Sequence, residues 1–286
     1  MQPKQWFNPK TDWWGIPVLV FFLTFLVIPL AWFAVMSFWR FDGVSYQPAF
    51  TFENFVEVFT TGGYLRAYGK TMMFSGITIG VSMLIGFPIA FFLTKVVKTF
   101  RNQMALFLII LTPFWTSYLI RTLAWVPTFG QKGVLNMVLL NLRFIDRPSE
   151  IFLYSSFSTI VAYVQLYSLF MAGPIFFSLA SIRPETIEAA QDLGASKFQI
   201  FKEIIFPLSL SGIAIGAIFI LTLTMGEFTT VAVIGGGKSA TIGTLINNLL
   251  PYNQFPQAAA NSVFLIVITS FGIYLMNRII DIRKEL

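Results

Sequence analysis

The sequence contains no cysteine and no histidine. Without cysteine there is no disulfide and no thiolate nucleophile, and without histidine there is no Ser-His or Cys-His triad. The same two absences remove the commonest ligands of transition metals. Charged residues are also scarce, at 11% of 286 residues, against about 25% in soluble domains. These absences argue against most hydrolases, against transition-metal enzymes and against a water-soluble globule.

Apolar surface is what the sequence has in excess. Apolar residues make up 56% of the chain, aromatic residues 17%, and phenylalanine alone occurs 33 times. The mean hydropathy is +0.74, so most side chains prefer hydrocarbon to water, and we expect the chain to lie in a lipid bilayer. Its 19 Lys and Arg residues are scattered and form no basic stripe, so no nucleic-acid partner is expected.

Six charge-poor stretches are long enough to cross about 30 Å of hydrocarbon as helices. The first is too long for a signal-peptide core and lacks a small-residue cleavage site, so we expect it to remain as an anchor. Pro251, Asn253 and Pro256 predict a loop before the last span. We therefore predict an all-α integral membrane protein, with residues 1–286 in a single transmembrane domain. The approximate spans are 14–39, 71–94, 104–126, 151–180, 208–234 and 258–277.

The distribution of Lys and Arg predicts which side of the membrane each loop faces. The loops on the side of the N-terminus hold eleven of these residues, and the loops on the other side hold seven. Because Lys and Arg gather in cytoplasmic loops, we expect both termini in the cytoplasm. The eleven are Lys4, Lys10, Lys95, Lys98, Arg101, Arg183, Lys197, Lys202, Arg278, Arg283 and Lys284.

Two pairs of glycines are spaced four residues apart within predicted spans. Gly76 and Gly80 lie in the second span, and Gly212 and Gly216 in the fifth. Such pairs place small residues one turn apart and let a neighbouring helix approach closely. Glycine is also simply frequent in membrane helices, so the alternative is that either pair has no packing role.

The longest cytoplasmic loop, residues 181–207, is predicted to form two short helices. Pro184 is suited to a first helical turn, and Gly194 is suited to ending that helix. Ser196 and Gln199 have the spacing of a capping box that begins the second helix, which we expect to end at Pro207. Apolar residues predict one apolar stripe on each helix. These are Ile187, Ala190 and Leu193 on the first, and Phe198, Phe201 and Ile205 on the second.

This loop resembles the cytoplasmic coupling motif of the membrane subunits of bacterial ABC importers. The resemblance rests on Glu188-Ala189-Ala190, on Gly194 six residues after Glu188, and on Ile204 followed by Phe206-Pro207. It implies that the helix inserts into a groove of an ATPase subunit, where small residues allow close approach and the glycine makes the turn. The alternative is an ordinary interfacial elbow with no partner. The residues implied in coupling are Glu188, Ala189, Ala190, Asp192 and Gly194.

Most of the chain is similar to the spermidine/putrescine-type permeases within that family. The stretches that carry this similarity are 52–64, 113–121, and Gly226-Glu227-Phe228 followed by three glycines. Such permeases often have an acidic residue and a tryptophan before a proline in the last outer loop, where this chain has Asn253-Gln254-Phe255-Pro256. The missing acid weakens the case for a polycation, and relatives of this type also carry opines and other small polar solutes.

The resemblance implies a six-span permease of the type I ABC importer fold in the bacterial inner membrane, working by alternating access. It implies a second, homologous permease chain in a heterodimer, two ATPase subunits and a periplasmic solute-binding protein. ATP and Mg would be used by the ATPase subunits, so we expect no cofactor, no metal and no catalytic residue in this chain. The predicted solute is small, polar and amine-containing, like a polyamine or an opine, with another small organic solute as the alternative.

Residues 232–239 mimic a phosphate-binding loop, with Ala232 in place of the first glycine. A true loop of this kind follows a buried strand in a soluble α/β domain and opens a helix that meets phosphate. Here the segment ends a predicted membrane span. We therefore expect its glycines only to turn the chain.

Arg121 and Glu227 are the two charges inside otherwise apolar predicted spans. Each costs about 2.5–3.5 kcal/mol at the bilayer centre unless it is paired or hydrated. Three interpretations stay open: an ion pair that holds spans three and five together, a place in the solute path, or snorkelling to the interface. Polar and aromatic residues near them are further candidates for the path, although helix packing is the alternative for the aromatics. These are Trp115, Tyr118, Tyr163 and Gln165.

Two other classes of protein are less consistent with the sequence. A secondary transporter usually has discontinuous half-helices in repeated halves together with intramembrane coupling acids, and only Glu227 is a candidate for such an acid. A membrane enzyme needs a polar catalytic constellation, which the sequence does not indicate.

Overall fold

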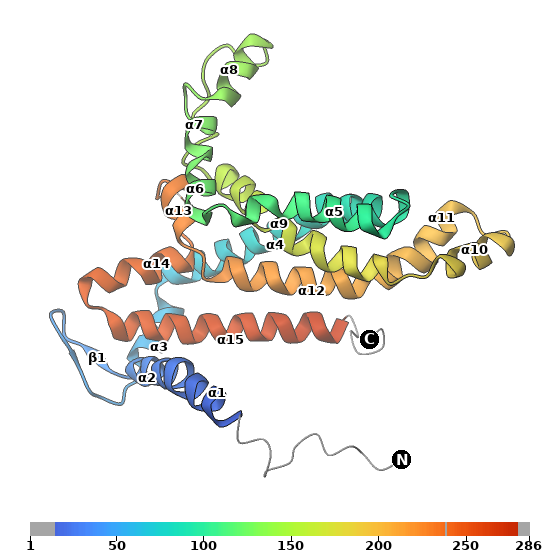
Figure 1. Ribbon diagram of the computed structural model, residues 1–286. Coiled ribbons are helices and arrows are strands. Elements are labelled where there is room, and N and C mark those ends of the chain that lie inside the picture. Colours follow the sequence, from blue (N-terminus) through green and yellow to red (C-terminus); the bar gives the residue numbers. More distant parts are fainter. Residues whose placement is uncertain (1–14, 238, 280–286) are drawn as a thin grey trace, which may run out of the picture. The chain divides into compact units, whose positions relative to one another are not determined.

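The computed structural model describes residues 15–237 and 239–279, and every structural statement below concerns these residues (Figure 1). Several residues used in the sequence predictions lie outside them. These are Lys4, Lys10, Trp14, Lys238, Arg283 and Lys284.

The described chain is helical apart from one short hairpin, as predicted for an all-α membrane protein. The α-helices are α1 (Gly15–Phe22), α2 (Ile28–Met36), α3 (Glu53–Thr60), α4 (Gly62–Phe91), α5 (Phe100–Leu111), α6 (Tyr118–Leu123), α7 (Trp125–Phe129), α8 (Val134–Asn141), α9 (Ser156–Ala180), α10 (Pro184–Asp192), α11 (Lys197–Ile200), α12 (Phe206–Met225), α13 (Thr229–Ile234), α14 (Ile242–Leu249) and α15 (Phe255–Ile279). Wider π-helical turns are η2 (Leu23–Val27), η3 (Phe92–Val96) and η5 (Phe201–Ile205), and tighter 3₁₀ turns are η4 (Thr112–Trp115) and η6 (Leu250–Tyr252). The hairpin strands are β1 (Arg40–Phe41) and β2 (Tyr46–Gln47).

Five described helices are long and apolar enough to cross a membrane. A sixth crossing is formed only if the helices over 100–115 and 118–141, which meet at an angle of 86°, count as one broken span. The straight third span predicted over 104–126 is therefore wrong. Pro113 begins the break, and the extended backbone of Thr116 and Ser117 completes it. The five straight crossings are Gly15–Met36, Gly62–Val96, Ser156–Ala180, Lys197–Met225 and Phe255–Arg278.

The fifth span also differs from its prediction at both ends. It begins at Lys197, because Pro207 sits in the first turn of α12, where it needs no hydrogen bond, and η5 joins α11 to α12 without a break. It ends at Met225 and not at residue 234, because the chain leaves the helix at Gly226 and starts the separate helix α13. Glu227 thus lies in a break between two helices.

The described residues form two compact units. The first unit contains the described residues up to Thr61 together with Asn248–Phe264. The second unit contains Gly62–Asn247 and the described residues from Leu265 onward. The segment that was predicted to be a loop before the last span is largely helical, because α14 occupies Ile242–Leu249. Asn253, with a φ of +59°, then turns the chain into α15.

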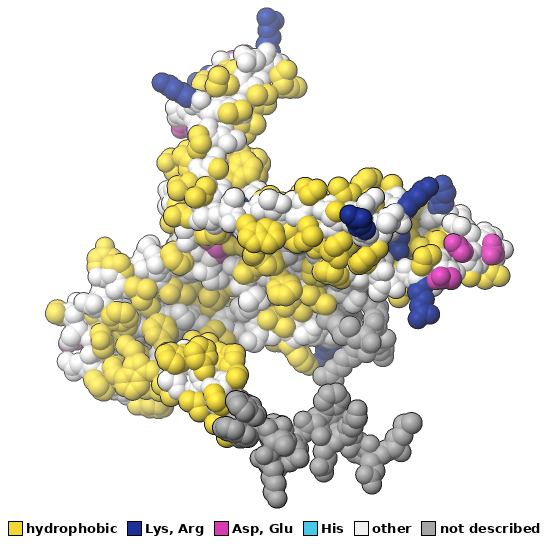
Figure 2. Space-filling view, in the orientation of Figure 1, with side chains coloured by type: hydrophobic (Ala, Val, Ile, Leu, Met, Phe, Trp, Pro, Cys, Tyr) yellow, Lys and Arg dark blue, Asp and Glu magenta, His cyan; other side chains and the backbone are white. Residues whose placement is uncertain are grey.

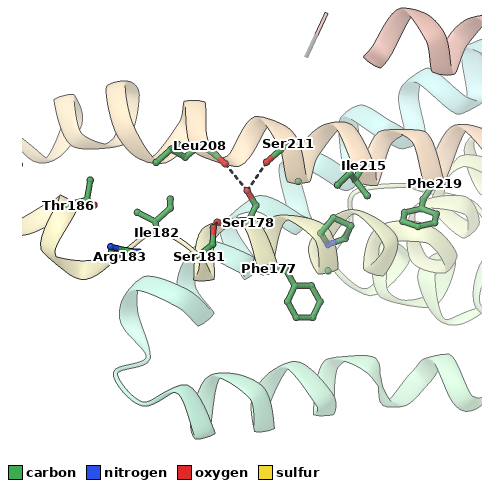
Figure 3. Close-up of a pocket in the computed structure, with 13 residues that line it drawn as sticks. Phe177, Ser178, Ser181, Ile182, Arg183, Thr186, Leu208, Ser211, Ile215 and Phe219 are labelled. Atoms are coloured by element: carbon green, nitrogen blue, oxygen red, sulfur yellow. Dashed lines mark hydrogen bonds between the residues drawn. The ribbon is translucent and has the colours of Figure 1, made fainter. Parts of the chain in front are cut away.

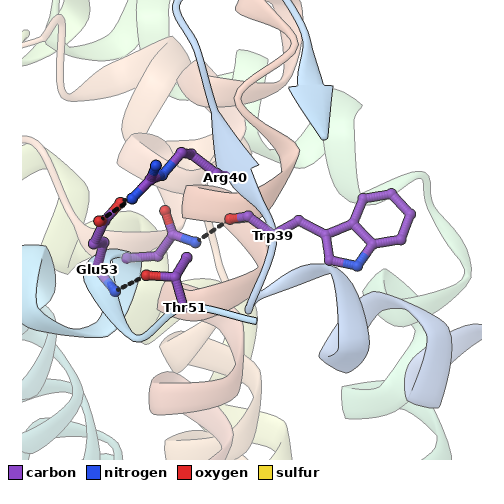
Figure 4. A network of polar contacts seen from close by, with 5 residues as sticks. Trp39, Arg40, Thr51 and Glu53 are labelled. Atoms are coloured by element: carbon purple, nitrogen blue, oxygen red, sulfur yellow. Dashed lines mark hydrogen bonds and ion pairs between the residues drawn. The ribbon is translucent and has the colours of Figure 1, made fainter. Parts of the chain in front are cut away.

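Polar contacts fix the hairpin of the first unit (Figure 4). The buried amide of Asn54 donates to the carbonyls of Ser37, at 2.8 Å, and Trp39, at 2.7 Å. Arg40 forms an ion pair of 2.5 Å with Glu53. Asp42 accepts hydrogen bonds from the amides of Ser45, at 2.7 Å, and Val44, at 3.0 Å, and these hold the pKa of its carboxyl below the ordinary value.

The second unit is built around α9, which packs against α4 on one side and α12 on the other (Figure 1). Gly212 and Gly216 on α12 allow this helix to approach α9 closely. A Cβ at Gly212 would lie 2.6 Å from the carbonyl oxygen of Pro174, and one at Gly216 would lie 2.9 Å from the Cα of Met171. The packing role predicted for this pair is confirmed. Gly76 and Gly80 have nothing within 4 Å of such a Cβ, so this pair makes no close helix contact within the described chain.

Candidate functional site

The loop over residues 181–207 forms an elbow of two helices, as the sequence predicts. Pro184 occupies the first turn of α10, and Gly194 adopts a φ of +84°, a conformation that glycine takes without strain. The Gly194 amide donates to the Gln191 carbonyl at 2.8 Å. Ser196 and Gln199 cap the next helix reciprocally, with bonds of 3.3 and 2.8 Å. All three sequence signals for the elbow are confirmed.

The two predicted apolar stripes are only partly buried. Ile187 and Ala190 pack against the core, but Leu193 is 89% exposed, because α10 ends at Asp192 and the helical spacing no longer applies. On the second helix Ile200 is buried, whereas Phe198 is 70% exposed. Both apolar side chains therefore lie on the surface of the elbow.

Acidic side chains gather at the end of the elbow where α10 lies (Figure 2). Glu185, Glu188 and Asp192 all lie on α10 and are exposed, as is Ala189 between them. The elbow thus combines acids, a small residue and two large apolar side chains on one exposed structure, which is the composition of a protein-docking surface.

Lys95 ties the base of this elbow to the end of the α4 span. Its Nζ donates to the carbonyl of Leu179 at 3.0 Å and to that of Ile182 at 3.5 Å. Leu179 lies in the last turn of α9, and Ile182 lies between α9 and α10. A single side chain therefore joins η3, α9 and the start of the elbow.

A cavity of about 450 Å³ lies where the two broken spans meet α9 and α12. Both breaks contribute to it, one through Thr116 and the other through Glu227. Its volume is within the range of sites for small organic molecules. The lining residues are Phe114, Thr116, Tyr118, Arg121, Leu166, Tyr167, Phe170, Leu223 and Glu227.

Glu227 is 8% exposed, and only one of its two carboxylate oxygens has hydrogen-bond partners among the described residues. Its Oε1 accepts hydrogen bonds from the hydroxyl of Tyr118 and, at 2.9 Å, from the amide of Thr230. Since the single Tyr118 proton goes to Glu227, the Thr230 hydroxyl donates to Tyr118 across 2.9 Å. The other carboxylate oxygen, Oε2, is buried and has no hydrogen-bond partner in the described chain.

Arg121 lines the same cavity and is also incompletely satisfied. Its guanidinium lies 5.9 Å from the centre of the Phe114 ring, a cation–π contact. Its Nε and one terminal nitrogen are buried without hydrogen bonds in the described chain. The only ion pair among the described residues is that of Arg40 with Glu53. The interpretation of Arg121 and Glu227 as an ion pair is thus not supported, although both side chains line the same cavity.

The other predicted path residues are distributed unevenly. Tyr118 lines the cavity, whereas Trp115 is 75% exposed and does not. Tyr163 is buried in the core beside Tyr167, with ring centres 5.7 Å apart, and neither its hydroxyl nor the Gln165 carbonyl oxygen has a partner in the described chain. Residues that no sequence signal singled out complete the site. They are Phe114, Leu166, Phe170, Leu223 and Thr230.

A second cavity of about 730 Å³ follows the same two helices, α9 and α12, toward the elbow (Figure 3). At its wall the Ser178 hydroxyl donates to the Leu208 carbonyl at 2.7 Å and lies 3.1 Å from the Ser211 hydroxyl. Arg183 and Thr186 line its end at the start of α10. Phe170 and Leu223 line the first cavity and Gly173 and Phe219 the second, so the two cavities succeed each other along the helix pair.

The glycine-rich segment that mimics a phosphate-binding loop follows a helix, α13, and not a strand. Its glycines turn the chain, with φ of +57° at Gly236 and +75° at Gly237. Beyond the turn, the Ser239 hydroxyl lies 3.1 Å from that of Ser156 at the start of α9. The segment is a turn fastened to α9, as the sequence predicts, and Lys238 lies outside the described residues.

Comparison with known proteins identifies the family. No family model matches, but the spermidine/putrescine transport system permease protein PotB of Haemophilus influenzae is 32% identical over 92% of both chains. The chain belongs to the permease subunits of spermidine/putrescine-type ABC transporters. The PotB protein of Escherichia coli strain K12 is 31% identical, over 88% of this chain and 91% of its own. A putative 2-aminoethylphosphonate transport system permease protein of Salmonella typhimurium is 24% identical, over 90% and 91%.

Solved structures of the same architecture support the fold. A chain in the crystal structure of a bacterial alginate ABC transporter, bound to its alginate pentasaccharide-loaded periplasmic protein, matches this permease with a TM-score of 0.76. The match covers 94% of both chains at 21% identity. The predicted ABC importer permease fold and its place in the bacterial inner membrane are therefore confirmed.

Proposed function

We propose that this permease couples ATP hydrolysis in separate ATPase subunits to the import of a small amine-containing solute by alternating access. The elbow is the observation that carries the proposal, because it presents an unpartnered apolar and acidic surface at the end of the two helices that line both cavities. Motion of the elbow would act directly on α9 and α12. The chain itself would bind neither ATP nor a metal.

The elbow residues proposed to couple the subunits have distinct roles. Ala189 and Ala190 leave room for close approach, Gly194 makes the turn, and Glu188 and Asp192 offer charges to basic groups of the ATPase. The exposed side chains of Leu193 and Phe198 supply the apolar contact. Buried aromatic anchors within a polar rim are typical of strong protein interfaces.

The proposed assembly contains a second, homologous permease chain, two ATPase subunits and a periplasmic solute-binding protein. Both termini and the elbow would face the cytoplasm. Because the chain has no native cysteine, orientation is tested with one introduced thiol at a time. Ser196→Cys should react with an impermeant reagent only in inverted vesicles, and Ser149→Cys only in intact spheroplasts; the reversed pattern would contradict the orientation.

Chemistry shared by the relatives supports an amine as the recognised group. Spermidine, putrescine and 2-aminoethylphosphonate, for which the relatives are named, all carry a primary ammonium group. The free Oε2 of Glu227 is suited to accept a hydrogen bond from such a group. The two cavities along α9 and α12 would then form successive parts of the solute path.

The coupling proposal is tested with two matched phenylalanines. Phe198 on the elbow is 70% exposed, and Phe144, after α8, is 74% exposed. In proteoliposomes that contain the whole transporter, Phe198→Ser should reduce both retention of the ATPase subunits and solute-stimulated ATP hydrolysis, and Phe144→Ser should change neither. Transport that continues without ATPase subunits, or equal effects of the two changes, would refute the proposal.

A further inference from the structure

Two opposite charges with unmet hydrogen bonds line the same cavity. Glu227 is more than nine-tenths buried, and its Oε2 has no partner in the described chain. Arg121 keeps two buried nitrogens without acceptors in the same part of the structure. A buried charge without a hydrogen-bonding partner is costly, so each group favours a ligand of the opposite kind.

The two groups do not form an ion pair with each other in the described chain. Glu227 is held by the amide of Thr230 on α13 and by the hydroxyl of Tyr118 on α6. Arg121, also on α6, is held over the ring of Phe114 on η4. With both charges fixed and no ion pair between them, the cavity presents a carboxylate and a guanidinium as two separate binding points.

The geometry points to a solute that carries both an ammonium and an anionic group, a zwitterion bound between Glu227 and Arg121. This inference rests on the proposed import of an amine-containing solute and narrows it. The ammonium donates to Oε2 of Glu227, and the anionic group accepts from Nε and a terminal nitrogen of Arg121, a pairing that suits the planar guanidinium. Phe114, Leu166, Phe170 and Leu223 contact the carbon chain between the two groups.

A pure polyamine satisfies only half of this cavity. It supplies donors for Glu227 but no acceptor for Arg121, and it brings positive charge into a cavity that already holds a guanidinium. A site with unpaired polar groups discriminates strongly against an analogue that lacks the matching group. The expected preference for the zwitterion over the matching amine is about 10- to 100-fold in affinity.

Ornithine and putrescine are the matched probes, since ornithine is putrescine with one added carboxylate. Binding is measured on the purified transporter, with both permease chains and the ATPase subunits in nanodiscs and no solute-binding protein, because that protein has a selectivity of its own. Unaltered transporter should bind ornithine more tightly than putrescine. Arg121→Gln should remove that preference and leave putrescine binding unchanged or stronger, whereas Arg66→Gln on the exposed part of α4 should keep the preference.

The outcomes separate this inference from the proposed function. Tighter binding of putrescine, or equal binding of the two probes, by the unaltered transporter would overturn the zwitterion site and retain the amine importer. Binding of neither probe would overturn the proposed amine site, and the inference with it. The comparison of ornithine with putrescine on the unaltered transporter uses no variant. It therefore tests the zwitterion site even if Arg121→Gln does not fold.

Discussion

The contact between α9 and α12 makes a sharp prediction about Gly212. A Cβ there would lie 2.6 Å from the Pro174 carbonyl oxygen and 2.9 Å from both the Pro174 carbonyl carbon and the Ile175 Cα. All three atoms belong to the backbone, so no side-chain rotation relieves the clash and the helices must separate. Overpacking of this kind costs about 1–3 kcal/mol. Gly212→Ala should therefore lower the melting temperature of the purified permease by several degrees.

The second span supplies the control for this prediction. A Cβ at Gly76 or Gly80 would have nothing within 4 Å, and alanine is the better helix former by about 1 kcal/mol. Gly76→Ala and Gly80→Ala should leave the melting temperature of the permease unchanged or raise it. The close-packing argument fails if Gly212→Ala melts at the same temperature as these two variants.

Three further predictions concern the elbow and the β1–β2 hairpin. Lys95→Met removes the donor to the Leu179 and Ile182 carbonyls and should weaken the described fold by about 1–2 kcal/mol, with solute-stimulated ATP hydrolysis reduced and Lys95→Arg less affected. Gly194→Ala forces a side chain into a φ of +84°, a cost of about 1–2 kcal/mol; ATP hydrolysis should fall, and Gly194→Asn should recover part of it. The lowered pKa of Asp42 means that its ionised carboxylate stabilises the hairpin above about pH 4 and loses this effect as the pH falls through that pKa, so Asp42→Ala should increase proteolysis of the hairpin at pH 7, and the difference from the unaltered chain should shrink as the pH is lowered.

Length and hydropathy predicted the straight spans because a helix needs about 20 predominantly apolar residues to cross the hydrocarbon of a bilayer. The stretches around α4, α9 and α15 are all helical, with ends that differ by several residues from the prediction. The broken third span was not predictable from hydropathy, since residues on both sides of the break remain apolar. Pro113 was a signal for it, but proline is tolerated inside other helices here, as Pro88 is in α4 and Pro174 in α9.

Local signals predicted the elbow better than periodicity did. Pro184, Gly194 and the Ser196–Gln199 pair each act through their own backbone, so their effect needs no knowledge of tertiary contacts. The burial of Leu193 and Phe198 depends on where α10 ends and which face of α11 meets the core. That information is tertiary, so the spacing of the apolar residues did not determine that these two side chains are exposed.

The charged residues of the cavity could be predicted from the sequence, whereas the apolar residues that line it could not. Arg121 and Glu227 stood out because charge is rare in membrane spans, whereas Leu166 and Leu223 are indistinguishable in sequence from leucines that face lipid. The charges were wrongly placed within continuous helices because a hydropathy profile assigns the whole stretch one conformation.

The helix breaks and the buried charges have a common physical cause. Backbone that leaves a helix inside the membrane needs hydrogen-bonding partners, and it is tolerated only where protein or a wet cavity supplies them. Glu227 illustrates this requirement, because one of its oxygens accepts a hydrogen bond from the Thr230 amide at the start of α13, while the other is buried and has no hydrogen-bond partner in the described chain. A straight helix through residue 227 would satisfy its own amides and would have no need of the carboxylate. The break therefore fixes the charge in place, and the charge in turn stabilises the break through the Thr230 amide.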